Sequence, residues 1–141
     1  MKLSLNFQLN EFSYSKTAIE YGIDNTPDRA ATMNLKKLCT FILQPLRDHI
    51  GKPVRISSGY RCKEVNALVG GSNTSKHLTG QASDIYVEGM SSFKLAKVIL
   101  NLNLEFHQLI IYPTFVHISF VKTAKPKRQL LYSKDYSGPQ I

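Results

Sequence analysis

Apolar residues recur at helical spacing over the longest patterned stretch of the chain, from about Ala30 to His49. The interval of three or four residues places side chains on one face of an α-helix. We therefore expect the main core helix here. Pro45 lies inside it, and because proline lacks an amide proton and clashes with the preceding turn, it should kink the helix or separate its last turn. The repeating positions are Leu35, Leu38, Cys39, Ile42, Leu43 and Leu46.

Three shorter segments carry the signals of further helices. The segment "FSYSKTAIEY" has Ser13 or Ser15 as a candidate N-cap and Gly22 as its end. The segment "CKEVNALVGG" predicts a short helix closed by Gly70 and Gly71. The segment "SSFKLAKVILNLN" predicts a second amphipathic helix that begins at its serine pair.

Strands are predicted where apolar and polar residues alternate. Val54 and Ile56 alternate in "KPVRISSGYR", and "SDIYVEG" follows a polar loop. The segments "EFHQLIIY" and "FVHISFV" read as two strands joined by a tight turn at Pro113 and Thr114, and "RQLLYS" adds an edge strand. Together these elements predict one α+β domain over residues 1–141, with a small, mainly antiparallel sheet and flanking helices.

The composition is that of a globular protein with a basic surface. Hydrophobic residues make up 43% of the chain and charged residues 20%, which is ordinary. The formal net charge is +8, and the excess is concentrated in Val121–Lys134. Such a charge favours anionic partners, such as nucleic acid, anionic lipid or an acidic wall polymer. No nucleic-acid-binding motif is present and no apolar run reaches the roughly 18 residues of a membrane span, so we expect neither nucleic acid nor a membrane as partner.

The N-terminal segment and the cysteines bear on localisation. The segment "MKLSLNFQLNEF" is interrupted by Asn, Gln and Glu and lacks a signal-peptide pattern. We expect synthesis in the cytoplasm and another route for any export. Cys39 and Cys62 are too few for a disulfide framework and form no CxxC pair. Cys39 belongs to the apolar helical pattern and is expected in the core.

Two of the four histidines have settings suited to a metal ion. His77 and Asp84 are seven positions apart in "SKHLTGQASDI", on either side of Gly80 and just before a predicted strand. His117 lies in "FVHISF", on the strand face opposite the apolar one. Two histidines and one carboxylate are a usual donor set of catalytic zinc, with one position left for water. The spacing alone does not show that the three residues converge.

The motif "SGYR…VN…VGG…SxHxxGxAxD", followed by the strand "VHIS", resembles the zinc D-Ala-D-Ala carboxypeptidase family. The wider superfamily includes the vancomycin-resistance D,D-dipeptidases, phage L-Ala-D-Glu endopeptidase lysins and the hedgehog signalling domain. The segments "TAIEYGIDNTP", "NLKKL" and "PLRDHIGKPVRISSGYR" also resemble its short, single-domain bacterial and phage members. The resemblance implies the hedgehog-like zinc peptidase fold. It also implies hydrolysis of peptidoglycan stem peptides, at a D-alanine C-terminus or at an L-Ala-D-Glu bond.

The resemblance also assigns residues. It implies that His77, Asp84 and His117 are the zinc ligands. It implies that Arg61 binds a substrate carboxylate or carbonyl oxygen, for which a guanidinium fork is suited. Ser75 matches a family serine that binds substrate or holds its loop. The expected protein is a monomer that acts at the cell wall on stem peptides, as a phage or prophage endolysin reaching the wall after membrane permeabilisation.

One group of the family pattern is missing. Many relatives carry an acid three positions before the last histidine, where it acts as general base, and here that position is Thr114. Glu105 is the only acid between Glu88 and His117, and Glu64 is a remote alternative. The gap leaves a second hypothesis open, a zinc-bearing or metal-free module that binds the cell wall without turnover, since zinc persists in the hedgehog signalling domain.

Strand parity ranks the substitutes for the missing acid. If the predicted turn has an even length, Ile110 faces His117, and Tyr112 shares their side of the sheet. Tyr112 is then the candidate oxyanion stabiliser, a role that a phenol can fill. His107 would lie on the other face. A bulge or a three-residue loop would reverse this ranking.

Overall fold

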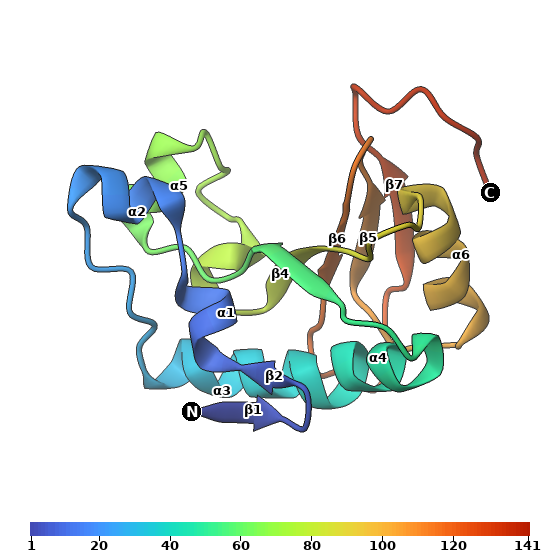
Figure 1. Ribbon diagram of the computed structural model, residues 1–141, viewed down its shortest axis with the longest axis horizontal. Coiled ribbons are helices and arrows are strands. Elements are labelled where there is room, and N and C mark those ends of the chain that lie inside the picture. Colours follow the sequence, from blue (N-terminus) through green and yellow to red (C-terminus); the bar gives the residue numbers. More distant parts are fainter.

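Helices account for most of the first half of the chain in the computed structural model, which describes residues 1–141 (Figure 1). Two short elements depart from α-geometry, namely a π-helical segment η1 and a 3₁₀ helix η2. The helices are α1 (Leu9–Ser13), α2 (Lys16–Tyr21), α3 (Arg29–Leu38), η1 (Cys39–Leu43), α4 (Gln44–Ile50), α5 (Lys63–Leu68), η2 (Lys76–Thr79) and α6 (Ser92–Asn101). None of them is long and apolar enough to cross a membrane.

The strands form one larger sheet and one small hairpin. The five-stranded sheet has the order β3-β4-β6-β5-β7, and its pairs are antiparallel except β5 with β7, which is parallel. The predicted α+β class with a mainly antiparallel sheet and an edge strand at "RQLLYS" is therefore confirmed. The strands are β1 (Lys2–Ser4), β2 (Phe7–Gln8), β3 (Arg55–Ser58), β4 (Ala82–Tyr86), β5 (Gln108–Ile111), β6 (Val116–Ser119) and β7 (Gln129–Tyr132).

The long helical pattern packs the core as predicted. All six of its repeating apolar residues are fully buried. They belong to a continuous cluster that includes Ile85 from β4, Leu109 from β5 and Val116 and Ile118 from β6. In Figure 1, α3 and α4 run along one side of the molecule, and α6 lies at the end of the sheet that carries β5 and β7. Burying each such side chain contributes about 1.5–3 kcal/mol.

Pro45 follows a π-helical segment, a local feature that the predicted kink or separated last turn did not specify. The five residues before Gln44 form η1, where the Gln44 amide donates to the carbonyl of Cys39, five residues back. Helix α4 then continues through Pro45 to Ile50, which is more than a last turn. A wider turn before a proline relieves the clash of its ring with the preceding carbonyls. The helix therefore absorbs Pro45 with a π-bulge.

The N-terminal region differs most from the expectation. The helix predicted from "FSYSKTAIEY" is α2, and the short helix α1 before it, which an extended Tyr14 separates from α2, was not predicted. Ser15 is the N-cap of α2, accepting from the Ala18 amide, and Gly22 ends it with a φ of +65°, as expected. The strands β1 and β2 were not predicted; their hairpin buries Leu3 and Phe7 against the core.

Candidate metal centre

Three side chains from different elements converge on one face of the five-stranded sheet. His77 comes from η2, Asp84 from β4 and His117 from β6, and the last two are direct partners across neighbouring strands. Asp84 Oδ1 lies 3.2 Å from His77 Nε2 and 3.0 Å from His117 Nδ1. One donor atom from each residue lies within 4.8 Å of the others. The convergence that the spacing left open is therefore present.

The loop before β4 is shaped so that His77 turns back over the sheet. Ser75 is the N-cap of η2, and its hydroxyl accepts a hydrogen bond from the His77 amide at 3.2 Å. Gly80 ends η2 with a φ of +74°, and a Cβ there would lie 2.4 Å from the carbonyl oxygen of Ala31. Because only glycine tolerates both the conformation and the contact, this turn can press against α3. Ser75 therefore caps the short helix that carries His77.

The backbone of the "SGYR" segment fixes the ring of His77. His77 Nδ1 lies 2.6 Å from the carbonyl oxygen of Gly59, and the Arg61 amide donates to the carbonyl of His77 at 3.1 Å. Since a carbonyl oxygen can only accept, Nδ1 carries the proton and Nε2 points at Asp84. Gly59 itself lies against α1, where a Cβ would come within 2.6 Å of the backbone of Phe12.

The donor chemistry of the cluster fits a zinc ion. In its neutral form His77 presents a bare Nε2 to Asp84 Oδ1 at 3.2 Å, so two acceptors face each other in a buried setting. A cation between them removes this conflict. Tetrahedral zinc with bonds of about 2.0–2.1 Å separates neighbouring donors by about 3.3 Å. The spacings of 3.2 Å and 3.0 Å around Asp84 match that separation.

The electrostatics keep Asp84 ionised. Burial raises its pKa, but with the rings of His117 and His77 protonated, their hydrogen bonds and charges outweigh burial and hold the pKa well below its usual range. Arg61 adds a cation, with its guanidinium 3.6 Å from Asp84 Oδ2. Burial lowers the pKa of Arg61 and Asp84 opposes that change. An arginine nevertheless stays charged in a protein.

The cluster lies in an open pocket of about 510 Å³, within the size range of small-ligand sites. The strand parity is confirmed, because Ile110 is the partner of His117 and Tyr112 lines the same pocket. Burial, and then the charge of Asp84, raises the pKa of Tyr112. The phenol therefore keeps its proton at neutral pH and can donate a hydrogen bond into the pocket.

Asp84 is the only acidic residue that lines this pocket. Glu64 and Glu105 are exposed and lie outside it, as does His107. Thr114, at the position of the expected acid, lines a separate hollow with Ser57, Tyr86 and Phe115. None of the remote substitutes considered from the sequence is therefore placed at the cluster.

Sequence reasoning missed the side chains that position Arg61. Arg61 Nε donates to Ser58 Oγ at 3.1 Å, and its Nη1 donates to Asn66 Oδ1 at 3.2 Å. Asn66 is only 3% exposed and donates in turn to the carbonyl of Ser72 at 2.9 Å. A Cβ on Gly71 would lie 2.1 Å from Asn66 Oδ1. The "VN…VGG" part of the motif thus helps to position the Arg61 side chain. We call the residues that do so the Arg61 socket, namely Ser58, Asn66, Gly71 and Ser72.

Asn25 is a second buried amide with a positioning role. Its Nδ2 donates to the carbonyls of Ser13 and Tyr60, at 2.9 Å and 3.0 Å. Its Oδ1 accepts from the Cys62 amide at 2.7 Å. Asn25 therefore links the end of α1, at Ser13, to the backbone of Tyr60 and Cys62, which precede and follow Arg61. Its signal in the sequence is the "GIDNTP" stretch, which reads as a turn.

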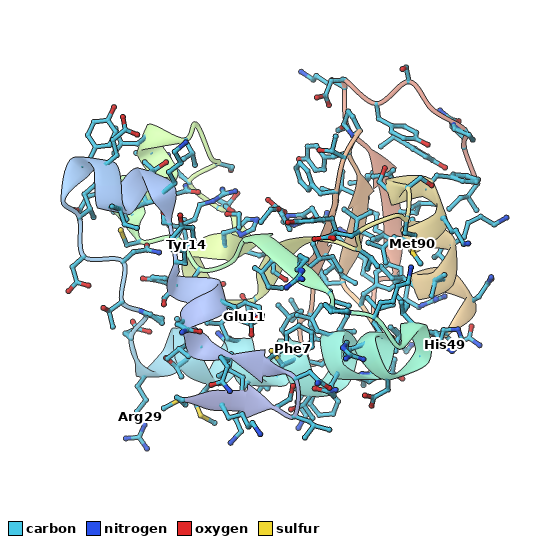
Figure 2. The ribbon with its side chains drawn as sticks, viewed as in Figure 1. Phe7, Glu11, Tyr14, Arg29, His49 and Met90 are labelled. Carbon is cyan, nitrogen blue, oxygen red and sulfur yellow. The ribbon has the colours of Figure 1, made fainter.

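The remaining histidine lies away from the cluster. His49 is in the last turn of α4, and Figure 2 shows it at the opposite side of the molecule from α5. A basic residue there interacts favourably with the carbonyl end of the helix. Its position agrees with a structural role.

A His-Asp-His cluster in an open pocket of an α+β domain is the donor arrangement typical of metal-dependent hydrolases. A family model described as Peptidase M15 matches residues 5–119, which include every residue of the cluster and of the Arg61 socket. The chain belongs to this family of zinc peptidases, which are D-Ala-D-Ala carboxypeptidase-like, as its motifs indicated. No curated protein sequence matches the chain.

Proposed function

We propose that the protein is a zinc metallopeptidase that hydrolyses peptidoglycan stem peptides, at a D-alanine C-terminus or at an L-Ala-D-Glu-type bond. The observation that carries this proposal is the set of three converging donors beside a fixed arginine, at the floor of an open pocket. His77, Asp84 and His117 would hold the ion. The family assignment supports the reaction class, and the motif supports the substrate class.

Zinc bound at this cluster would supply an activated water and polarise the carbonyl group of the scissile bond. The residues of the chain supply orientation around it. Arg61 is held by Ser58 and Asn66, so its free donors can bind a substrate carboxylate or carbonyl oxygen. Tyr112, with its raised pKa, donates to the oxygen on which negative charge develops.

A second candidate function is a zinc-bearing wall-binding module without catalytic turnover. The observation that favours it is the absence of any acid other than Asp84 from the pocket lining. A general base contributes about 10²–10⁴-fold to such reactions. The lack of this group would leave binding as the main activity.

Digestion of purified peptidoglycan separates the two candidates. The protein is incubated with wall fragments in the presence of zinc, and the released peptides are identified by mass spectrometry. The peptidase proposal expects a defined new terminus that disappears with a chelator and in His77→Ala. Full zinc occupancy with no released peptide on several wall substrates would support the binding module instead.

We further propose that the protein acts at the cell wall as a monomer, in the manner of a phage or prophage endolysin. Its net charge of +8 suits an anionic wall polymer. Lysis of permeabilised cells by added protein, with intact cells unaffected, is the expected result. Sedimentation of the protein at its monomer mass tests the oligomeric state.

A further inference from the structure

A second cavity of about 270 Å³ lies beside the metal pocket, and we call it the outer pocket. Its walls come from the junction of α1 and α2, from the end of β3 and from α5. Figure 2 shows Tyr14, one of its lining residues, beside α1 on the side of the molecule opposite β7. The residues that matter below are Tyr14, Lys16, Ser58, Tyr60, Arg61 and Val69.

The outer pocket and the metal pocket share a wall. Arg61 and Val69 line both cavities. Arg61 Nε bonds to Ser58 Oγ on the outer side, while Nη2 lies 3.6 Å from Asp84 on the metal side. A ligand that reaches across Arg61 can therefore occupy both pockets at once.

The lining of the outer pocket suits an acidic amino-acid residue. It carries two cations, Lys16 and Arg61, and no acidic side chain. Hydroxyl groups offer further hydrogen bonds, and Tyr14, Tyr60 and Val69 offer apolar surface for an aliphatic stem. Its volume is near the lower end of the range for ligand sites, about 300–1,000 Å³. The cavity is thus suited to one residue of a longer ligand.

We propose that the outer pocket is a second substrate subsite, which binds a carboxylate-bearing residue of the peptide chain whose bond lies in the metal pocket. The inference rests on the proposed peptidase function and specifies which peptides the protein prefers as substrates. The preferred substrate is an acidic peptide that extends across Arg61, and a free dipeptide reaches only one of the two pockets.

Lys16 provides the test, because it lies in the outer pocket and outside the metal pocket. Two stem peptides are compared, L-Ala-D-Glu-L-Lys-D-Ala-D-Ala and the same peptide with D-Gln in place of D-Glu. Lys16→Ala is expected to raise KM for the D-Glu peptide about three- to tenfold, in line with the loss of one partly screened charge pair. The value of kcat should not change, and the D-Gln peptide should be unaffected.

Lys94→Ala is the matched control, since Lys94 is also an exposed lysine in the first turn of a helix and lines neither pocket. It should change neither constant for either peptide. An equal effect of Lys16→Ala on the two peptides, or no effect on either, overturns the inference.

Binding of the same two peptides to the chelated, metal-free protein is measured by calorimetry in parallel. A preference for D-Glu that Lys16→Ala removes supports the outer pocket even if no peptide is hydrolysed, in which case only the peptidase proposal fails. Turnover together with equal affinity for D-Glu and D-Gln peptides overturns the outer pocket and leaves the peptidase proposal in place.

Discussion

The carbonyl oxygen of Gly59 lies 2.6 Å from Nδ1 of His77, so a backbone group of the "SGYR" segment selects which ring nitrogen faces Asp84. Partners of this kind orient metal ligands, and their loss typically costs about 10–100-fold in metal affinity. The relation links the arginine motif to the histidine motif. Neither motif is complete without the other.

Substituting Gly59 should therefore weaken zinc binding without removing a ligand. A Cβ in Gly59→Ala would lie 2.6 Å from the backbone of Phe12 and displace the carbonyl from His77. We expect zinc affinity to fall about 10–100-fold, measured by competition with a chromophoric chelator. Gly89→Ala is the control, because its turn has a φ of +79° and no neighbour within 4 Å. If both variants bind zinc equally well, the carbonyl of Gly59 has no such role.

Zinc should stabilise the folded protein by mass action. A ligand at about 1,000 times its Kd adds about 4 kcal/mol to the free energy of unfolding. We expect the melting temperature to rise with added zinc and to fall with a chelator. His117→Ala should melt at the same temperature with and without zinc. A variant that still responds fully to zinc would show that His117 is not a ligand.

The sequence predicted the elements whose residues repeat over several turns or alternate along a strand. Leu35 to Leu46 identify the core helix because six apolar residues share one face. The pairing of Ile110 with His117 followed from the length of one turn. The three donors were found through their motif, since no local pattern places residues 77, 84 and 117 together.

Other features have no local signal. The strands β1 and β2 have three and two residues, too few for an alternating pattern to appear. Nothing in the local sequence marks Asn66 or Asn25 as core residues, and only the folded chain shows that both are buried and hydrogen-bonded. For this reason the sequence did not identify the side chains that position Arg61.

Asn66→Ala should impair substrate binding through Arg61. The change removes one acceptor of the guanidinium and leaves the carbonyl of Ser72 without its donor. Loss of an intramolecular hydrogen bond costs about 0.5–1.5 kcal/mol net, and Ser72 is exposed, so water can take the place of the lost donor. The free energy of unfolding should therefore fall by about that amount in urea denaturation. KM should rise more than kcat falls. Asn66→Asp keeps the acceptor for Arg61, so a KM close to that of the native protein is expected, and an equally raised KM would argue against the positioning role.

The two cysteines should differ in reactivity. Burial, and then the charge of Glu11, raises the pKa of the Cys39 thiol far above its ordinary value, while Cys62 is only partly buried. A thiol-specific reagent should modify one cysteine in the native protein and two in denaturant, because the thiolate is the reactive form. Mass spectrometry of the labelled protein identifies the site, and rapid labelling of Cys39 would contradict its burial.

The same shift fixes the direction of a pH effect on stability. Because the folded-state pKa of Cys39 is raised, its neutral thiol contributes fully below 9.0, the ordinary pKa of an exposed cysteine, and stability declines as the pH rises above that value. Urea midpoints between pH 7 and pH 10 measure the decline. In Cys39→Ala, which has no thiol to ionise, the decline of stability with rising pH should be smaller.

Tyr112→Phe tests the candidate oxyanion stabiliser, the only phenol that lines the metal pocket. The phenol lies in the metal pocket, and its raised pKa makes it a hydrogen-bond donor rather than a base. Loss of one donor to a developing oxyanion typically costs about 10²–10³-fold in kcat. We expect a fall of that size with KM and melting temperature unchanged. Tyr86→Phe is the matched control, since Tyr86 lines the separate hollow with Thr114 and should keep full activity. Equal activity of Tyr112→Phe and the native protein would exclude the phenol from catalysis and leave the polarisation of the carbonyl to zinc and Arg61.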